Sequence, residues 1–60
     1  MEWIDINEQQ PEIGLEVKVM TIYEFEDTGI WDGTKWLNSN GEFKGEAEEA
    51  PKWKLTYSGA

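Results

Sequence analysis

The chain is 60 residues long and contains neither cysteine nor histidine. A domain of this length buries only about 60% of the surface that its unfolded chain exposes, so its hydrophobic core is marginal. Small domains usually gain stability from disulfides, a bound metal or self-association. The composition excludes disulfides and also excludes thiolate and imidazole metal ligands. A core rich in large rings, or a homodimer, remains as the source of stability.

The aromatic content favours the first of these sources. Four Trp, two Tyr and two Phe make up 13% of the residues, and each buried ring removes roughly 150–250 Å² from water. We therefore expect one domain over residues 1–60, with Trp3 and Trp53 in its core. Trp31 and Trp36 lie beside a predicted hairpin turn, where each ring either joins the core or stays exposed as a binding anchor.

Alternating side chains predict a strand over residues 15–25. One face of this segment carries apolar, β-branched and aromatic residues, namely Leu15, Val17, Val19, Thr21, Tyr23 and Phe25. The other face is mostly charged, a period of two that is typical of a strand. Met20 and Ile22 interrupt the charged face, which indicates that the strand is central or that its second face is partly covered.

Turn residues divide the remainder of the chain into shorter strands. Turns are predicted at residues 9–14, 26–29 and 38–41, and at Asp32-Gly33, a dipeptide typical of type I′ hairpins. Short strands are predicted at residues 3–6, 30–31, 34–37, 42–44 and 52–57. Residues 46–50 have good helix propensity, but Gly45 and Pro51 limit this segment to one helical turn or a loop.

These elements predict an all-β fold, or a β-rich fold with one short helical turn. Four or five short strands joined by tight turns are typical of a small antiparallel meander or of an SH3-like, partly open barrel.

The charge of the chain narrows its choice of partner. Thirteen acidic residues face five lysines and no arginine, which gives a formal net charge of -8. Such a surface repels nucleic acid and anionic membranes and attracts basic protein surfaces. Residues 1–5 are acidic where a secretory signal would be basic, and no apolar run approaches the ~20 residues that cross a bilayer. We expect a cytoplasmic protein that binds a basic protein, not nucleic acid or a membrane.

The composition also argues against catalysis and against cofactors. Without His, Cys or Arg, the chain has no nucleophile-base dyad and no guanidinium clamp. Pairs of carboxylates occur by chance in so acidic a chain, but a meander of this size leaves little room for the cleft that glycoside hydrolysis needs. The acidic residues do not follow the twelve-residue calcium loop, and the glycines form no phosphate cradle. We expect no enzyme activity, no cofactor and no metal.

Two acidic clusters are candidate binding surfaces. They consist of Glu24, Glu26 and Asp27, which flank the end of the long strand, and of Glu46, Glu48 and Glu49 in the helical segment. Each cluster is either a solvated surface that keeps the protein soluble or a docking face for a basic groove. Rigidly spaced carboxylates can imitate DNA, which carries about one charge per 1.7 Å of its axis. Lys52 and Lys54 weaken this imitation because they make one strand face basic.

Short motifs along the chain carry a family resemblance. They are Trp3-Ile4, Pro11 and Gly14, Val17-Lys18-Val19, and Gly29-Ile30-Trp31-Asp32-Gly33 with Trp36. The chain resembles a small phage and prophage family of unknown function, whose members open with Trp-Ile, a Leu-Pro-x-x-Gly turn and a valine-rich strand. Gln10 replaces the usual Leu, and the family's closing His-Trp-Met-Pro-Leu-Pro keeps only Trp53 and Leu55 here. The resemblance implies a viral or prophage origin and a β-rich domain, but no activity.

Charge, composition and resemblance together predict a small phage-type protein that binds and inhibits or redirects a host protein. A nuclease or defence effector with a basic groove fits this description. Two alternatives stay open. One is a homo-oligomeric sponge that holds a nucleotide-type ligand between Trp31 and Trp36, with lysines on its phosphates. The other is a structural accessory of a phage assembly.

Overall fold

The computed structural model describes residues 2–56, in which six strands form one antiparallel sheet. The strands are β1 Ile4–Asp5, β2 Glu16–Met20, β3 Glu26–Trp31, β4 Lys35–Leu37, β5 Phe43–Glu46 and β6 Lys52–Leu55, and η1 is a 3₁₀ turn at Ala47–Glu49. The expected all-β fold with one short helical turn is confirmed. Within this range, no helix has the length and apolar character needed to cross a membrane.

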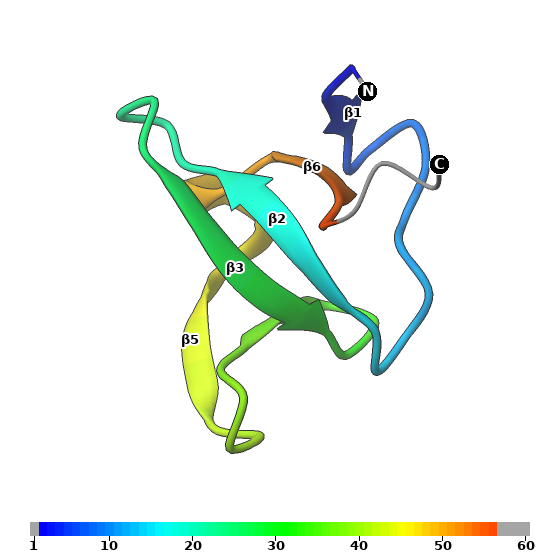
Figure 1. Cartoon of the computed structure of the whole chain (residues 1–60), viewed down its shortest axis with the longest axis vertical. Coiled ribbons are helices and arrows are strands. Elements are labelled where there is room, and N and C mark those ends of the chain that lie inside the picture. The colour runs from blue at the N-terminus through cyan, green and yellow to red at the C-terminus, as the bar shows by residue number, and fades with distance from the viewer. Residues whose placement is uncertain (1, 57–60) are drawn as a thin grey trace.

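The sheet combines a meander with a returning strand. Its order is β1-β6-β2-β3-β4-β5, so β2 to β5 pair consecutively and β6 comes back to the free side of β2. Figure 1 shows the β2–β3 hairpin crossing the front of the molecule, with its turn projecting at one end. The short η1 turn connects β5 to β6 and so brings the chain back to the centre of the sheet. This arrangement agrees with a small, partly open barrel.

Tryptophans fill most of the core on one face of this sheet. The buried apolar residues are Ile6, Val17, Val19, Trp31, Trp36, Ala50 and Trp53. The predicted core position of Trp53 is confirmed, and its indole Nε1 donates to the backbone oxygen of Gln9 at 2.8 Å. Trp3 is only half-buried, with the Lys54 ammonium 4.5 Å from its ring centroid. Large aromatic rings in the core therefore take the place of disulfides and metal sites as a source of stability.

The strand predicted over residues 15–25 is wrong in its second half. Strand β2 ends at Met20, and the chain reverses because the Glu24 N–H donates to the Thr21 oxygen and the Thr21 N–H donates to the Phe25 oxygen, both at 2.9 Å. Glu24 takes a left-handed φ of 65°, the usual end of a three-residue hairpin loop. The turn predicted at residues 26–29 is also wrong, because these residues belong to β3 and pair with β2.

The other predicted turns are closer to the structure. In the β3–β4 hairpin, the Asp32 N–H donates to the Lys35 oxygen at 3.1 Å, so the central residues are Gly33 and Thr34, one position later than predicted. The turn at residues 38–41 is confirmed, with Gly41 at a φ of 83°. Strand β6 ends at Leu55, and Tyr57, which the sequence placed in this strand, lies outside the described residues.

Candidate protein-binding surface

The β2–β3 turn and η1 bring the two acidic clusters to one end of the molecule. The Ile22 N–H in the turn donates to the Glu49 backbone oxygen at 3.0 Å, which ties the two segments together. We call this region the acidic end, and it comprises Glu24, Asp27, Glu46, Glu48 and Glu49. Segments more than twenty residues apart in the sequence thus place their carboxylates on adjoining elements.

Glu26 is the one predicted member that does not belong to the acidic end. In the β2–β3 register Asp27 lies opposite the buried Val19, whereas Glu26 lies opposite Met20. Side chains alternate between the two faces of a strand, so Glu26 points to the outer face of the sheet. There its carboxylate is 3.9 Å from the Lys18 ammonium, in an exposed pair that contributes little to stability.

A hollow of about 130 Å³ opens at the acidic end. Its apolar lining includes Val19, Trp36 and Ala50, and the charged side chains around it are Asp27, Lys44, Glu46 and Glu49. Apolar walls with a mainly anionic border suit a ligand group that has an aliphatic stem and a cationic head. Lysine and arginine side chains have this form.

Lys44 neutralises one carboxylate of this border. Its ammonium donates to Asp27 Oδ1 at 3.0 Å and to the Thr28 backbone oxygen at 2.6 Å. The pKa of Asp27 is lowered, first by the hydrogen bond from the Thr28 N–H and then by Lys44. Within residues 2–56, no lysine forms an ion pair with the four glutamates of the acidic end. The acidic end therefore keeps most of its negative charge.

Three of the five lysines lie on the other face of the sheet. In the β2–β6 register Lys18 is opposite Lys54, and Lys52 is opposite Met20. These positions face away from the side of Val19 and Trp53, where the core lies. The positive charge predicted for Lys52 and Lys54 is thus separated from the hollow, while Lys44 lines it and Lys35 lies opposite Glu46 in the β4–β5 register.

The two tryptophans of the β3–β4 hairpin are core residues. Trp31 and Trp36 are each 2% exposed, with ring centroids 4.9 Å apart and planes inclined by 61°. The Trp36 Nε1 donates to the Ala50 oxygen at 3.0 Å, and the Trp31 Nε1 donates to Gln10 Oε1 at 3.3 Å. Of the two alternatives left open for these rings, burial in the core is the one that the structure shows, so they are not available as exposed binding anchors. They also offer no open stacking platform for the nucleotide-type ligand of the sponge hypothesis.

Three large apolar residues that the sequence did not single out for binding are exposed in the β2–β3 turn. Tyr23 is 75% exposed, Phe25 is 69% exposed and Ile22 is 56% exposed. Alternation assigned Tyr23 and Phe25 to the buried face of a strand that ends before them. Ile22 was the signal that could have revealed the turn. It is an apolar residue on the otherwise charged face of the predicted strand, and a strand with one buried face does not need an apolar residue there.

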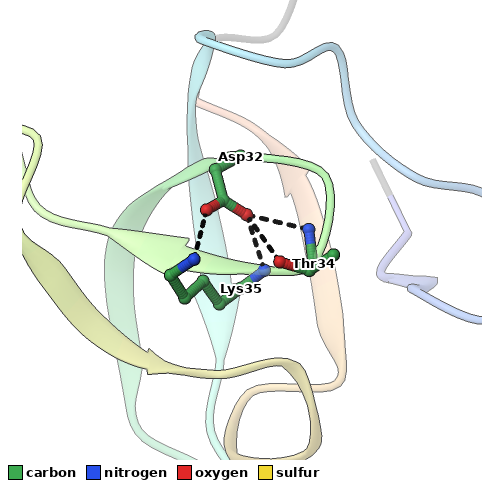
Figure 2. A network of polar contacts seen from close by, with 3 residues as sticks. All are labelled: Asp32, Thr34 and Lys35. Atoms are coloured by element: carbon green, nitrogen blue, oxygen red, sulfur yellow. Dashed lines mark hydrogen bonds and ion pairs between the residues drawn. The ribbon is translucent and has the colours of Figure 1, made fainter.

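Asp32 is the most strongly hydrogen-bonded carboxylate in the hairpins, but its contacts are local. Figure 2 shows its Oδ1 accepting from the N–H groups of Thr34 and Lys35, both at 2.8 Å, and from the Thr34 hydroxyl at 3.2 Å. Its Oδ2 accepts from the Lys35 ammonium at 2.7 Å. The Lys35 ammonium is the first cause that lowers the pKa of Asp32, and the N–H groups add to it. Asp32 thus fixes the β3–β4 turn.

We predict that Asp32 contributes to the loss of stability in acid. Because its pKa is lower in the folded than in the unfolded chain, it stabilises the fold above the unfolded value of about 3.9. This contribution disappears as the pH falls below that value towards the folded pKa. Asp32→Asn should therefore be less stable at neutral pH but lose less stability below about pH 4. The midpoint of thermal unfolding, followed from pH 7 to pH 2, measures both effects.

The control for this experiment is Glu12→Gln, which removes one charge at an exposed residue outside the turn. It separates the effect of Asp32 from the effect of net charge. If Asp32→Asn and the unmodified chain lose the same amount of stability between pH 7 and pH 2, Asp32 does not contribute to the loss of stability in acid.

Comparison with protein-family models, with curated proteins and with solved structures finds no match to this chain. The resemblance to the phage family therefore stays a prediction. Within residues 2–56, no three carboxylates are arranged to hold a metal ion.

Proposed function

We propose that this domain is a small acidic phage-type protein that binds a host protein through the acidic end and inhibits or redirects it. The partner presents a basic surface, such as the groove of a nuclease or of a defence effector. The domain acts by occupying that surface in the host cytoplasm and not by catalysis. Part of its affinity comes from carboxylates that imitate the charge of nucleic acid.

The separation of charge in the fold carries this proposal. Within residues 2–56, the four glutamates of the acidic end form no ion pair with lysine and adjoin Asp27, while Lys18, Lys52 and Lys54 lie on the opposite face of the sheet, where Asp5, Glu16 and Glu26 are interspersed with them. A mixed surface that served solubility alone would intersperse the two signs. The described chain measures only 30 × 22 × 20 Å, so these charges act together on an approaching basic surface.

The hollow gives the acidic end a means of selecting its partner. A lysine or arginine side chain entering it would lay its aliphatic stem against Val19 and Trp36, with its cationic head near Glu46 and Glu49. Phosphates of nucleic acid would be repelled by the same carboxylates. This chemistry supports a basic protein over nucleic acid as the partner.

The immobilised domain can be used to isolate its partner from host lysate. We expect association with that partner to be fast at low salt and to slow by at least about tenfold at high salt, because salt screens the steering by exposed charge. The double variant Glu24→Lys/Glu48→Lys should slow association at low salt and change dissociation much less. Glu46 and Glu49 are left unchanged because their side chains form a capping box that supports η1, in which Glu49 Oε1 accepts the Glu46 N–H at 3.1 Å. Stopped-flow association rates over a salt series provide the measurement.

The matched control is Glu8→Lys/Glu12→Lys, which alters the net charge equally at exposed residues in the loop before β2. If charge acts through the acidic end, this control should retain most of the association rate at low salt. Association that is insensitive to salt, or equally slow in both double variants, would contradict the proposal.

A further inference from the structure

The β2–β3 turn exposes an unusual amount of apolar surface for so small a protein. Five large apolar residues are exposed among residues 2–56, and three of them, Ile22, Tyr23 and Phe25, lie within this single turn. The core is meanwhile short of aliphatic residues and depends on tryptophan. Rings that could have enlarged a marginal core are displayed to solvent, and contiguous exposed apolar surface commonly marks an interaction site.

Hydrogen bonds hold these side chains in a fixed turn. The Phe25 N–H donates to the Thr21 hydroxyl at 3.1 Å, in addition to the two backbone hydrogen bonds that close the loop. The bond from Ile22 to the Glu49 oxygen fastens the turn to η1. Figure 1 shows the turn projecting from the end of the β2–β3 hairpin. A rigid apolar projection loses little conformational entropy when it binds.

Carboxylates adjoin the apolar side chains of the turn. Glu24 lies within the loop, Asp27 follows it in β3, and Glu49 is joined to it through Ile22. A matching surface has an apolar pocket bordered by lysine or arginine. A second copy of this chain is a poorer match, because an isologous contact through the turn would bring like charges together.

We propose that the β2–β3 turn is the anchor of the interface, with Ile22, Tyr23 and Phe25 inserting into an apolar pocket that has a cationic border. This inference rests on the proposed function and assigns the source of its affinity. The acidic end governs the rate of association, and the turn governs how long the complex lasts. Aromatic residues seated in such pockets commonly dominate the free energy of an interface.

Two synthetic helical peptides provide defined probes for this inference. One combines leucine and lysine on opposite faces, and the other replaces every leucine by serine at the same charge. Binding is measured by calorimetry and by the amide chemical shifts of the protein. We expect the leucine peptide to bind at least about tenfold more tightly than the serine peptide and to shift the amides of residues 21–26.

The protein variants are Tyr23→Ser/Phe25→Ser and the control Ile13→Ser, whose side chain is 67% exposed in a different loop. The double variant should lose at least about tenfold in affinity for the leucine peptide, and the control should lose little. Exposed substitutions usually change stability by less than about 0.5 kcal/mol, and the thermal midpoint verifies this. If the double variant does not fold, Tyr23→Ser alone replaces it.

The outcomes separate the inference from the proposed function. Equal binding of both peptides, unchanged in the double variant, would overturn the anchor and leave the charge-based function in place. Failure of both peptides to bind would overturn both. Light scattering tests for a homodimer. If the unmodified protein is a homodimer and the double variant is a monomer, the turn binds a second copy of this chain, and the inference that it anchors a host protein is overturned.

Discussion

Replacing Trp36 by alanine is expected to unfold most of the protein at room temperature. The side chain is 2% exposed, and truncation of a buried tryptophan costs about 3–5 kcal/mol. Removing its indole also leaves the buried Ala50 oxygen without the 3.0 Å hydrogen bond that it accepts, at a further cost of about 1–3 kcal/mol. A 60-residue domain has a free energy of unfolding of only about 3–9 kcal/mol, so these losses remove most or all of it.

Urea unfolding followed by circular dichroism measures this effect, with Tyr23→Ala as the control. Both substitutions truncate an aromatic side chain, but Tyr23 is 75% exposed and should change stability by less than about 0.5 kcal/mol. Trp36→Phe separates the two contributions, because it keeps a ring in the core and removes only the indole donor. A Trp36→Ala variant with the urea midpoint of the unmodified chain would show that the core does not depend on this ring.

Sequence periodicity predicts the fold class well because local rules govern the core of the sheet. Val17 and Val19 alternate with charged residues and are buried in β2, and Gly45 and Pro51 confine the helical segment to one turn. The strand prediction fails at the β2–β3 turn because polar and apolar residues continue to alternate beyond Met20, although β2 ends there. The apolar residues that follow, Tyr23 and Phe25, are exposed and do not pack in the core. Periodicity reports which residues can share a face, but not where the chain reverses.

The candidate surface was only partly predictable. Both acidic clusters were visible in the sequence, yet their meeting depends on a contact between Ile22 and Glu49, which no local pattern encodes. The burial of Trp31 and Trp36 depends on how β4 and β5 fold back over β3. The pairing of Asp27 with Lys44 likewise joins residues seventeen positions apart. Long-range pairing therefore decides which charges and rings remain available to a partner.

Gly29→Ala is the second substitution for which we expect a large effect, because Gly29 makes room for the Trp36 ring. Gly29 is buried in β3, two residues before Trp31 and on the same face of the strand. A Cβ atom added there would lie 3.1 Å from Trp36 Cε3 and 3.4 Å from Cδ2, so the ring would have to shift against its hydrogen bond to the Ala50 oxygen. Overpacking of this kind costs about 1–3 kcal/mol, whereas the lower entropy of the unfolded chain returns only about 0.4–1 kcal/mol.

The expected result for Gly29→Ala is a net destabilisation of about 1–2 kcal/mol, or a fall of roughly 4–15 °C in the thermal midpoint. Gly45→Ala is the matched control. Gly45 also neighbours Trp36, directly opposite it in the β4–β5 register, but a Cβ there would meet its nearest neighbour, Glu49 Oε1, only at 3.8 Å. Neither glycine has a positive φ, so alanine fits both backbones and only the contact with the ring differs. Gly45→Ala should therefore be neutral or stabilising, and equal effects of the two substitutions would show that Gly29 is not required for ring packing.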